Sequence, residues 1–155
     1  MALYFLDTSA LGKYYRPEPG SDFVSGLFAD RHSKRVISHL SMAEMESVFA
    51  IKLRIREIDQ ETAAIARRRL ESDVGRRNLL VASVRDEHFG VARKLLISHG
   101  EKGLRTLDAL QLSVALGLRN AGYSAILVAS DQKFCNVAQV EGFAVTNPDR
   151  PGVTI

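Results

Sequence analysis

The most regular feature of the sequence is an alternation of short apolar runs with longer stretches of mixed polarity. Five apolar runs have the length of a β-strand, at residues 3–6, 36–38, 78–83, 125–130 and 143–145. Most are rich in Val, Ile, Leu and Ala without regular polar interruptions. Such runs are typical of strands that are covered on both faces, as in a parallel sheet.

The stretches between these runs have apolar residues near a 3.6-residue period, which predicts helices. We expect helices at residues 9–15, 21–30, 41–56, 59–74, 86–99, 106–120 and 131–140. Strands that alternate with helices predict βαβ units, whose right-handed crossovers put helices on both faces of the sheet. The expected fold class is therefore α/β, a three-layer α/β/α sandwich around a central, mainly parallel sheet of about five strands.

Composition limits the class of protein without fixing its function. The 155 residues fit a single domain, residues 1–155, and 46% hydrophobic and 25% charged residues are usual for a globular protein. The net charge of +3 permits a nucleic-acid partner without requiring one. Cys135 is the only cysteine, so no internal disulfide can form. Neither a signal peptide nor a membrane-spanning run is evident, so we expect a cytoplasmic protein with no membrane association.

Four carboxylates lie where predicted strands end or predicted helices begin. They are Asp7, Glu44, Asp108 and Asp131. Sites in open α/β sheets form outside the carboxyl ends of the strands, which is where the first, second and fourth of these acids are expected. Asp108 joins them if the helix at residues 106–120 begins near the same edge of the sheet.

Each acid also has a purely structural interpretation. Asp7 and Asp131 are N-cap candidates, and Ser-Met-Ala-Glu at residues 41–44 matches a capping box with Glu44 at its N3 position. Asp108 would suit the positive end of a helix behind a Thr106 cap. These interpretations remain open for each acid taken singly.

The four acids taken together favour a metal site. Carboxylates held close together raise one another's pKa values unless a cation compensates their charge. A set of oxygen donors without His or Cys selects Mg²⁺ or Mn²⁺ over zinc. Because Mg²⁺ keeps several waters and takes few carboxylates, it leaves room for a phosphate oxygen. The pattern therefore indicates metal-assisted phosphodiester chemistry.

The segments that contain the acids also carry a family resemblance. They read LDTSAL, SMAEMESV, RTLDALQLSVA and LVASDQKF, in that order along nearly the whole chain. This ordered set resembles the acidic motifs of PIN-domain ribonucleases, above all the VapC-like toxins of bacterial type II toxin–antitoxin pairs. The resemblance implies an endoribonuclease that depends on Mg²⁺, with Mn²⁺ as an alternative. It also implies an RNA substrate, a cognate antitoxin protein as partner, and a homodimer.

The resemblance assigns roles residue by residue. The catalytic set is Asp7, Glu44, Asp108 and Asp131. The three aspartates would hold the metal, and Glu44 would orient or deprotonate the attacking water. Glu46 points about 200° away from Glu44 on a helix, so only one of the two can face the site. Glu44 is preferred because it lies nearer the expected helix start.

Several other residues are assigned supporting roles. Ser9 and Ser130 would hydrogen-bond a ligand or water. Four cations are expected to contact substrate phosphates, with ordinary solvated surface charge as the alternative: Lys13, Arg16, Arg105 and Lys133. The arginines at 67–69 and 76–77 form either an RNA track or a solvated helix face. The helices at 41–74 either form a groove for an antitoxin helix or bury their apolar residues in the core.

Two other functions compete with a nuclease. A phosphoacceptor signalling domain would need adjacent acids after the first strand and an Asp after the third. Asp7 instead stands alone, and the run NLLVAS ends in Ser83. The second is a catalytically silent module of PIN fold that binds RNA or protein, which the intact acids disfavour.

Overall fold

A five-stranded parallel sheet forms the centre of the computed structural model, which describes residues 1–152. The strands are β1 (Ala2–Leu6), β2 (Ser33–Ser38), β3 (Leu80–Ala82), β4 (Ala125–Val128) and β5 (Val145–Thr146). Their order in the sheet is β3-β2-β1-β4-β5, and every pair is parallel. The expected three-layer α/β/α fold is confirmed.

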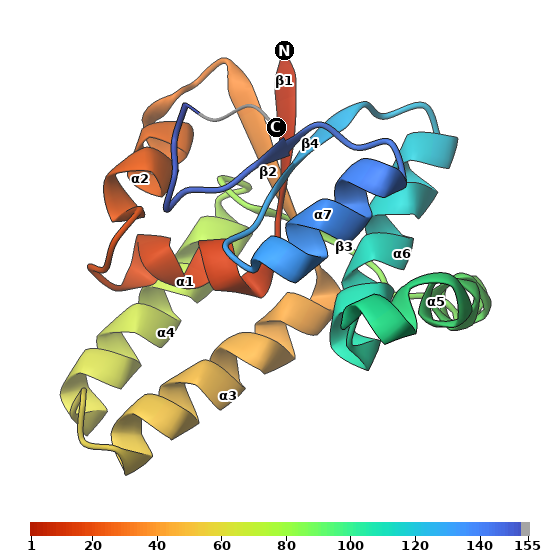
Figure 1. Ribbon diagram of the computed structural model, residues 1–155. Helices are drawn as coiled ribbons and strands as arrows, with labels where there is room; N and C mark the ends of the chain where they lie inside the picture. The colour runs from red at the N-terminus through yellow and green to blue at the C-terminus, as the bar shows by residue number, and fades with distance from the viewer. Residues whose placement is uncertain (153–155) are drawn as a thin grey trace.

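Helices connect the strands and cover both faces of the sheet (Figure 1). They are α1 (Thr8–Tyr15), α2 (Ser21–Ala29), α3 (His39–Arg54), α4 (Gln60–Gly75), α5 (Asp86–His99), the 3₁₀ helix η1 (Gly100–Lys102), α6 (Thr106–Asn120) and α7 (Gln132–Val140). Figure 1 shows α3 and α4 as a pair that extends away from the sheet. Within residues 1–152, no helix has the length and apolarity needed to cross a bilayer.

The alternation of side chains along each strand separates two hydrophobic cores. Phe5, Val36 and Leu127 are buried on the face covered by α5, α6 and α7. The next residues along the same strands, Leu6, Ile37 and Val128, are buried on the face covered by α1 to α4. Because successive strand residues point to opposite faces, continuous apolar runs are required when both faces are covered.

The strand register fixes which edge of the sheet carries the four acids. Leu6 pairs with Val128, so β1 and β4 end at the same level. The Asp7 amide donates a 2.9 Å hydrogen bond to the Val128 carbonyl and thereby extends this alignment by one residue. The chain segments that follow the two central strands therefore start side by side.

Several strand boundaries predicted from the sequence are wrong, and two of them are wrong because helix ends use the residues in question. Asn78 was expected to open the third strand, but its side chain and the Leu79 amide bind Asp73 and close the end of α4. The strand therefore begins at Leu80. Phe143 was expected in the last strand, but its amide donates to the Ala138 carbonyl in a Schellman-type ending of α7 after Gly142.

The predicted start of α3 is also wrong. The helix begins at His39 rather than at residue 41, with Ser38 at the N-cap position. Ser41 therefore lies inside the helix and forms no capping box with Glu44. The apolar period identified the helix correctly, but Ser38 and Ser41 are both acceptable cap residues, and local sequence does not choose between them.

We predict that Leu127→Ala destabilises the protein by about 2–5 kcal/mol, because it opens a cavity in the core beneath α5 to α7. Leu127 is fully buried at the centre of the sheet. Ile97→Ala is the matched control, because this side chain is 73% exposed and its loss should cost less than about 0.5 kcal/mol. Urea denaturation of the three proteins measures both values, and equal midpoints for the two variants would contradict the assigned core.

Candidate active site

Asp7 is a buried carboxylate at the carboxyl end of the central strand. It is the N-cap of α1, and its Oδ2 atom accepts hydrogen bonds from the Ser9 amide at 3.1 Å and the Ser9 hydroxyl at 2.7 Å. Its pKa is raised to about 6, mainly by burial and to a smaller extent by the charges of Glu44 and Asp108, against the lowering effect of the Ser9 hydrogen bonds. The capping role and a place in an acidic site are thus both present in this residue.

Glu44 faces Asp7 from the second turn of α3, not from the first turn as the sequence predicted. Its Oε2 atom accepts hydrogen bonds from the Thr8 hydroxyl at 2.8 Å and from the Gln111 amide at 2.5 Å. Glu46, two residues later, instead pairs with Arg67 at 2.8 Å on an exposed surface. The helical rotation between the two glutamates separates them as expected.

Asp108 and Asp131 reach the same edge from α6 and α7. Asp131 is the N-cap of α7 and accepts from the Phe134 amide at 3.0 Å. The N-cap of α6 is Arg105, so the expected Thr106 cap is wrong, and Asp108 at N3 accepts from the Arg105 amide at 3.2 Å. Each of these acids therefore accepts a backbone hydrogen bond at the start of its helix.

Arg105 connects these two acids. Its Nε and Nη2 atoms donate to the two carboxylate oxygens of Asp108 at 2.9 and 3.2 Å, and Nη2 lies 3.7 Å from Oδ2 of Asp131. The hydrogen bonds and charge of Asp108 raise the pKa of Arg105, with smaller contributions from Asp131 and Asp7. The guanidinium is therefore a cation that balances the acidic edge.

Ser9 and Ser130 lie among the acids. The Ser9 hydroxyl donates to Asp7 and accepts a 3.0 Å hydrogen bond from the Ser130 amide, so it joins the ends of β1 and β4. The Ser130 carbonyl accepts from the Asn147 side chain at 3.2 Å. The Ser130 hydroxyl oxygen is buried and has no hydrogen-bond partner within residues 1–152. An unpaired buried hydroxyl at this point suits a ligand or water.

The donor chemistry of the acidic edge fits Mg²⁺ or Mn²⁺, which prefer carboxylate oxygens and water. Within residues 1–152, however, no three of the His, Cys, Asp and Glu side chains are grouped closely enough to hold an ion as they stand. Arg105 instead contacts both Asp108 and Asp131. The residues thus fit a divalent cation by type, and binding would require the exposed Arg105 side chain to move.

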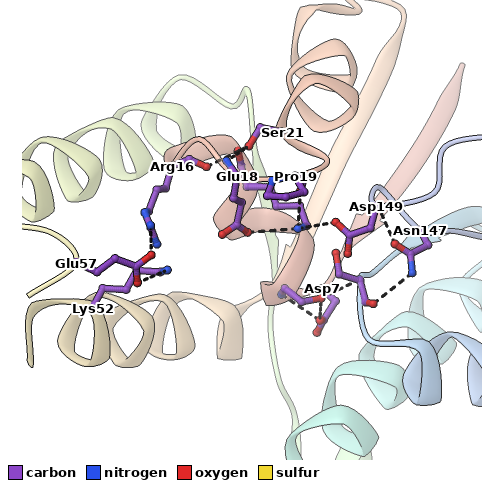
Figure 2. A network of polar contacts seen from close by, with 12 residues as sticks. Asp7, Arg16, Glu18, Pro19, Ser21, Lys52, Glu57, Asn147 and Asp149 are labelled. Carbon is purple, nitrogen blue, oxygen red and sulfur yellow. Dashed lines mark hydrogen bonds and ion pairs between the residues drawn. The ribbon is translucent and has the colours of Figure 1, made fainter. Parts of the chain in front are cut away.

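The other three cations assigned to phosphate binding differ in whether their charges are paired, and Figure 2 shows the pairing of Arg16 with Glu57. Lys13 is buried and bound to Asp149 at 2.8 Å and to the Pro19 carbonyl at 2.8 Å. Arg16 pairs with Glu57, although its buried Nη1 atom has no partner within residues 1–152. Lys133 is exposed at the start of α7 and packs over Gly103.

A cavity of about 300 Å³ adjoins the acids on the side of α1 and α3. Its polar wall includes Ser130, Arg16 and Lys52, and its apolar wall includes Met45 and Phe49. The cavity wall therefore combines cationic and apolar groups beside Ser9 and Ser130.

Two of the arginines at 67–69 form contacts within the protein, whereas the sequence suggested an RNA track or a solvated helix face. Arg67 pairs with Glu46 and lies over the Phe49 ring, and Arg69 lies 4.1 Å from the centre of the Tyr14 ring. Both side chains therefore join α4 to its neighbours. Arg68, Arg76 and Arg77 are exposed.

Gln111 is the residue of this site that sequence reasoning missed. It is fully buried and contacts Glu44, Thr8, Ser38 and Ser41. A signal was available in its spacing, because it follows Asp108 by three residues and so lies on the same side of α6.

We predict that Asp7→Asn stabilises the metal-free protein at pH 7.5 by about 2–3 kcal/mol, and by progressively less as the pH falls from about 6 towards 4. The raised pKa means that the folded state binds the Asp7 proton more tightly than the unfolded state, so ionisation costs stability as pH rises through this window. Asn keeps the N-cap role and avoids that cost. Urea denaturation with EDTA across this range measures the difference, and a pH-independent difference would contradict the assignment.

The whole fold is shared with a known family and with solved structures. The family model described as the PIN domain matches residues 4–140. No curated protein matches the chain. VapC20 of Mycobacterium tuberculosis, described as a Sarcin-Ricin loop cleaving toxin, is 18% identical at a TM-score of 0.66, over 97% of this chain and 99% of that one.

Two further structures are similar across almost their full length. VapBC-1 from nontypeable Haemophilus influenzae is 18% identical at a TM-score of 0.61, over 96% of this chain and 99% of that one. VapBC2 from Rickettsia felis, whose structure was solved bound to a promoter DNA fragment, is 17% identical. Its TM-score is 0.59, over 94% of this chain and 98% of that one. With its parallel sheet, acidic edge and match over most of its length, this chain belongs to the PIN domain family.

Proposed function

We propose that the protein is a metal-dependent endoribonuclease that hydrolyses RNA phosphodiester bonds as the toxin of a toxin–antitoxin pair. The observation that carries this proposal is the convergence of Asp7, Glu44 and the Arg105-bridged pair Asp108 and Asp131 at one edge of a PIN fold. Carboxylates concentrated around a buried Asp7 have no structural requirement to be so close, because Ser or Thr also cap helices well.

The four acids divide two tasks between them in the proposed reaction, cation binding and acceptance of a proton. Asp7, Asp108 and Asp131 would hold the divalent cation, Mg²⁺ or Mn²⁺, and Ser9 would keep Asp7 oriented through its 2.7 Å hydrogen bond. When bound, the cation would lower the pKa of a water and offset negative charge on the phosphate. Glu44 would accept the proton of the attacking water. Ser130 would donate its unpaired hydroxyl to a water or phosphate oxygen.

RNA is proposed as the substrate on two grounds. VapC20, similar in fold, is described as cleaving the Sarcin-Ricin loop. Arg105 is 72% exposed beside the acids, and Lys133 is exposed on α7, so both suit phosphate contacts. Arg16 and Lys13 would contribute only if their present carboxylate partners released them.

The proposed protein partner is a cognate antitoxin, as the family resemblance implies. Ile51 on α3, Ile55 at its C-cap and Ile65 on α4 are 48–59% exposed, and such exposed apolar side chains suit contact with a partner helix. Met45 and Phe49 on the other side of α3 are core residues, so the helix serves both purposes. A homodimer and a cytoplasmic location complete the proposal.

We predict that the purified protein cleaves RNA only with Mg²⁺ or Mn²⁺, and that EDTA stops cleavage reversibly. Asp7→Asn should lower the rate at least about 100-fold, since it removes a buried carboxylate from the site. Glu46→Gln is the matched control, because Glu46 pairs with Arg67 away from the acids and should keep wild-type activity. Gel analysis of a labelled RNA measures each rate, and normal metal-dependent cleavage by Asp7→Asn would sink the assignment. RNA binding without cleavage by the wild type would favour the silent module.

We also predict that Arg105 and Lys133 supply phosphate contacts. In a Glu44→Gln background, Arg105→Gln and Lys133→Gln should each reduce the slope of log affinity against log salt by about one. Lys94→Gln is the control, because Lys94 is exposed on α5 away from the acids and should leave the slope unchanged. Fluorescence anisotropy with a single-stranded RNA measures the slopes, and identical slopes for all three variants would refute the assignment.

A further inference from the structure

Gln111 occupies an unusual position for an uncharged polar residue. It is fully buried in α6, yet its side-chain amide contacts four polar side chains from three other elements or their caps. These are Thr8 at the start of α1, Ser38 at the end of β2, and Ser41 and Glu44 in α3. The amide is therefore the meeting point of the segments that form one side of the acidic edge.

The hydrogen-bond partners fix the orientation of this amide. The Ser38 hydroxyl donates to Oε1 of Gln111 at 2.6 Å, and Nε2 lies 2.5 Å from Oε2 of Glu44. A flipped amide would set its oxygen against the Glu44 carboxylate, and two acceptors at that separation repel each other. Gln111 can therefore only donate towards Glu44.

Glu44 is held by one oxygen and leaves the other available. Gln111 and Thr8 both donate to Oε2, and no hydrogen bond between residues 1–152 engages Oε1. A glutamate side chain has several rotatable bonds and would otherwise sample many positions in the second turn of a helix. Two donors on one oxygen restrict the carboxylate and leave Oε1 for a water.

We propose that Gln111 is a positioning residue that aims the free oxygen of Glu44 at the attacking water. This inference rests on the proposed nuclease function, because it assigns Glu44 the role of proton acceptor. The Ser38 hydroxyl holds the Gln111 amide in one orientation, and Gln111 in turn orients the Glu44 carboxylate. The end of β2 thus contributes, through α6, to the position of Glu44 in α3. Gln111 itself need not touch RNA or metal.

A kinetic double-mutant cycle tests this role. Gln111→Met keeps the volume of the buried side chain and removes the donor, so kcat should fall about 10–100-fold while KM stays within about twofold. Glu44→Gln should lower kcat at least as much. If Gln111 acts through Glu44, adding Gln111→Met to Glu44→Gln should cost less than about threefold. An equal loss in both backgrounds, or a change in KM alone, would overturn the proposal.

A spectroscopic measurement tests the same contact without relying on activity or on a Gln111 variant. The side-chain amide protons of Gln111 should exchange slowly with solvent in the wild-type protein, and NMR should show a large shift of their resonances in Glu44→Ala. Glu46→Ala should leave them in place, because Glu46 faces Arg67 instead. Unchanged Gln111 resonances in Glu44→Ala would overturn the proposal.

The two measurements also separate this inference from the proposed function. A wild-type protein that cleaves no RNA but shows the expected Gln111 shift contradicts the nuclease proposal while retaining the contact. A protein that cleaves RNA but keeps equal losses in both kinetic backgrounds contradicts only the positioning role.

Discussion

The arrangement of the acidic edge depends on one electrostatic constraint, the burial of the Asp7 carboxylate at the end of the central strand. Burial raises its pKa, and the nearby charges of Glu44 and Asp108 act in the same direction. A buried carboxylate destabilises the folded state unless hydrogen bonds or opposite charges stabilise its ionised form. Neighbouring residues supply both at this edge. Ser9 donates two hydrogen bonds to Asp7, while Arg105 spans Asp108 and Asp131. The carboxylates at this edge therefore favour a bound positive charge.

Much of this arrangement follows from local sequence. Continuous apolar runs predicted a covered parallel sheet, and the carboxyl ends of such strands meet at one edge, which placed Asp7 and Asp131 together. The start of α3 and the limits of β3 could not be predicted, because Ser38 and Ser41 are equally good caps and Asn78 binds Asp73 at the end of α4, where Asp73 also accepts from the distant Tyr15. Local propensity contains no information about such partners.

The polar connections around the acids were the least predictable part. Gln111 contacts Glu44 although the two residues are 67 positions apart in the sequence. The residues around a buried glutamine do not indicate which distant side chain it will bind. The assignment of Lys13 to phosphate contact faces a similar difficulty, since its buried bond to Asp149 joins segments far apart in the chain. Charge alone does not reveal whether a cation is free, so long-range pairing decides which basic residues can meet a substrate.

We propose that the acidic edge binds a divalent cation and that this binding displaces Arg105 from Asp108 and Asp131. Crystals soaked in Mn²⁺ and measured near the manganese absorption edge test it directly. We expect one or more anomalous peaks bounded by Asp7, Asp108 and Asp131, with the Arg105 guanidinium turned away from both of its present partners. At saturating Mn²⁺, an acidic edge without anomalous signal and with Arg105 still bound to Asp108 would contradict it.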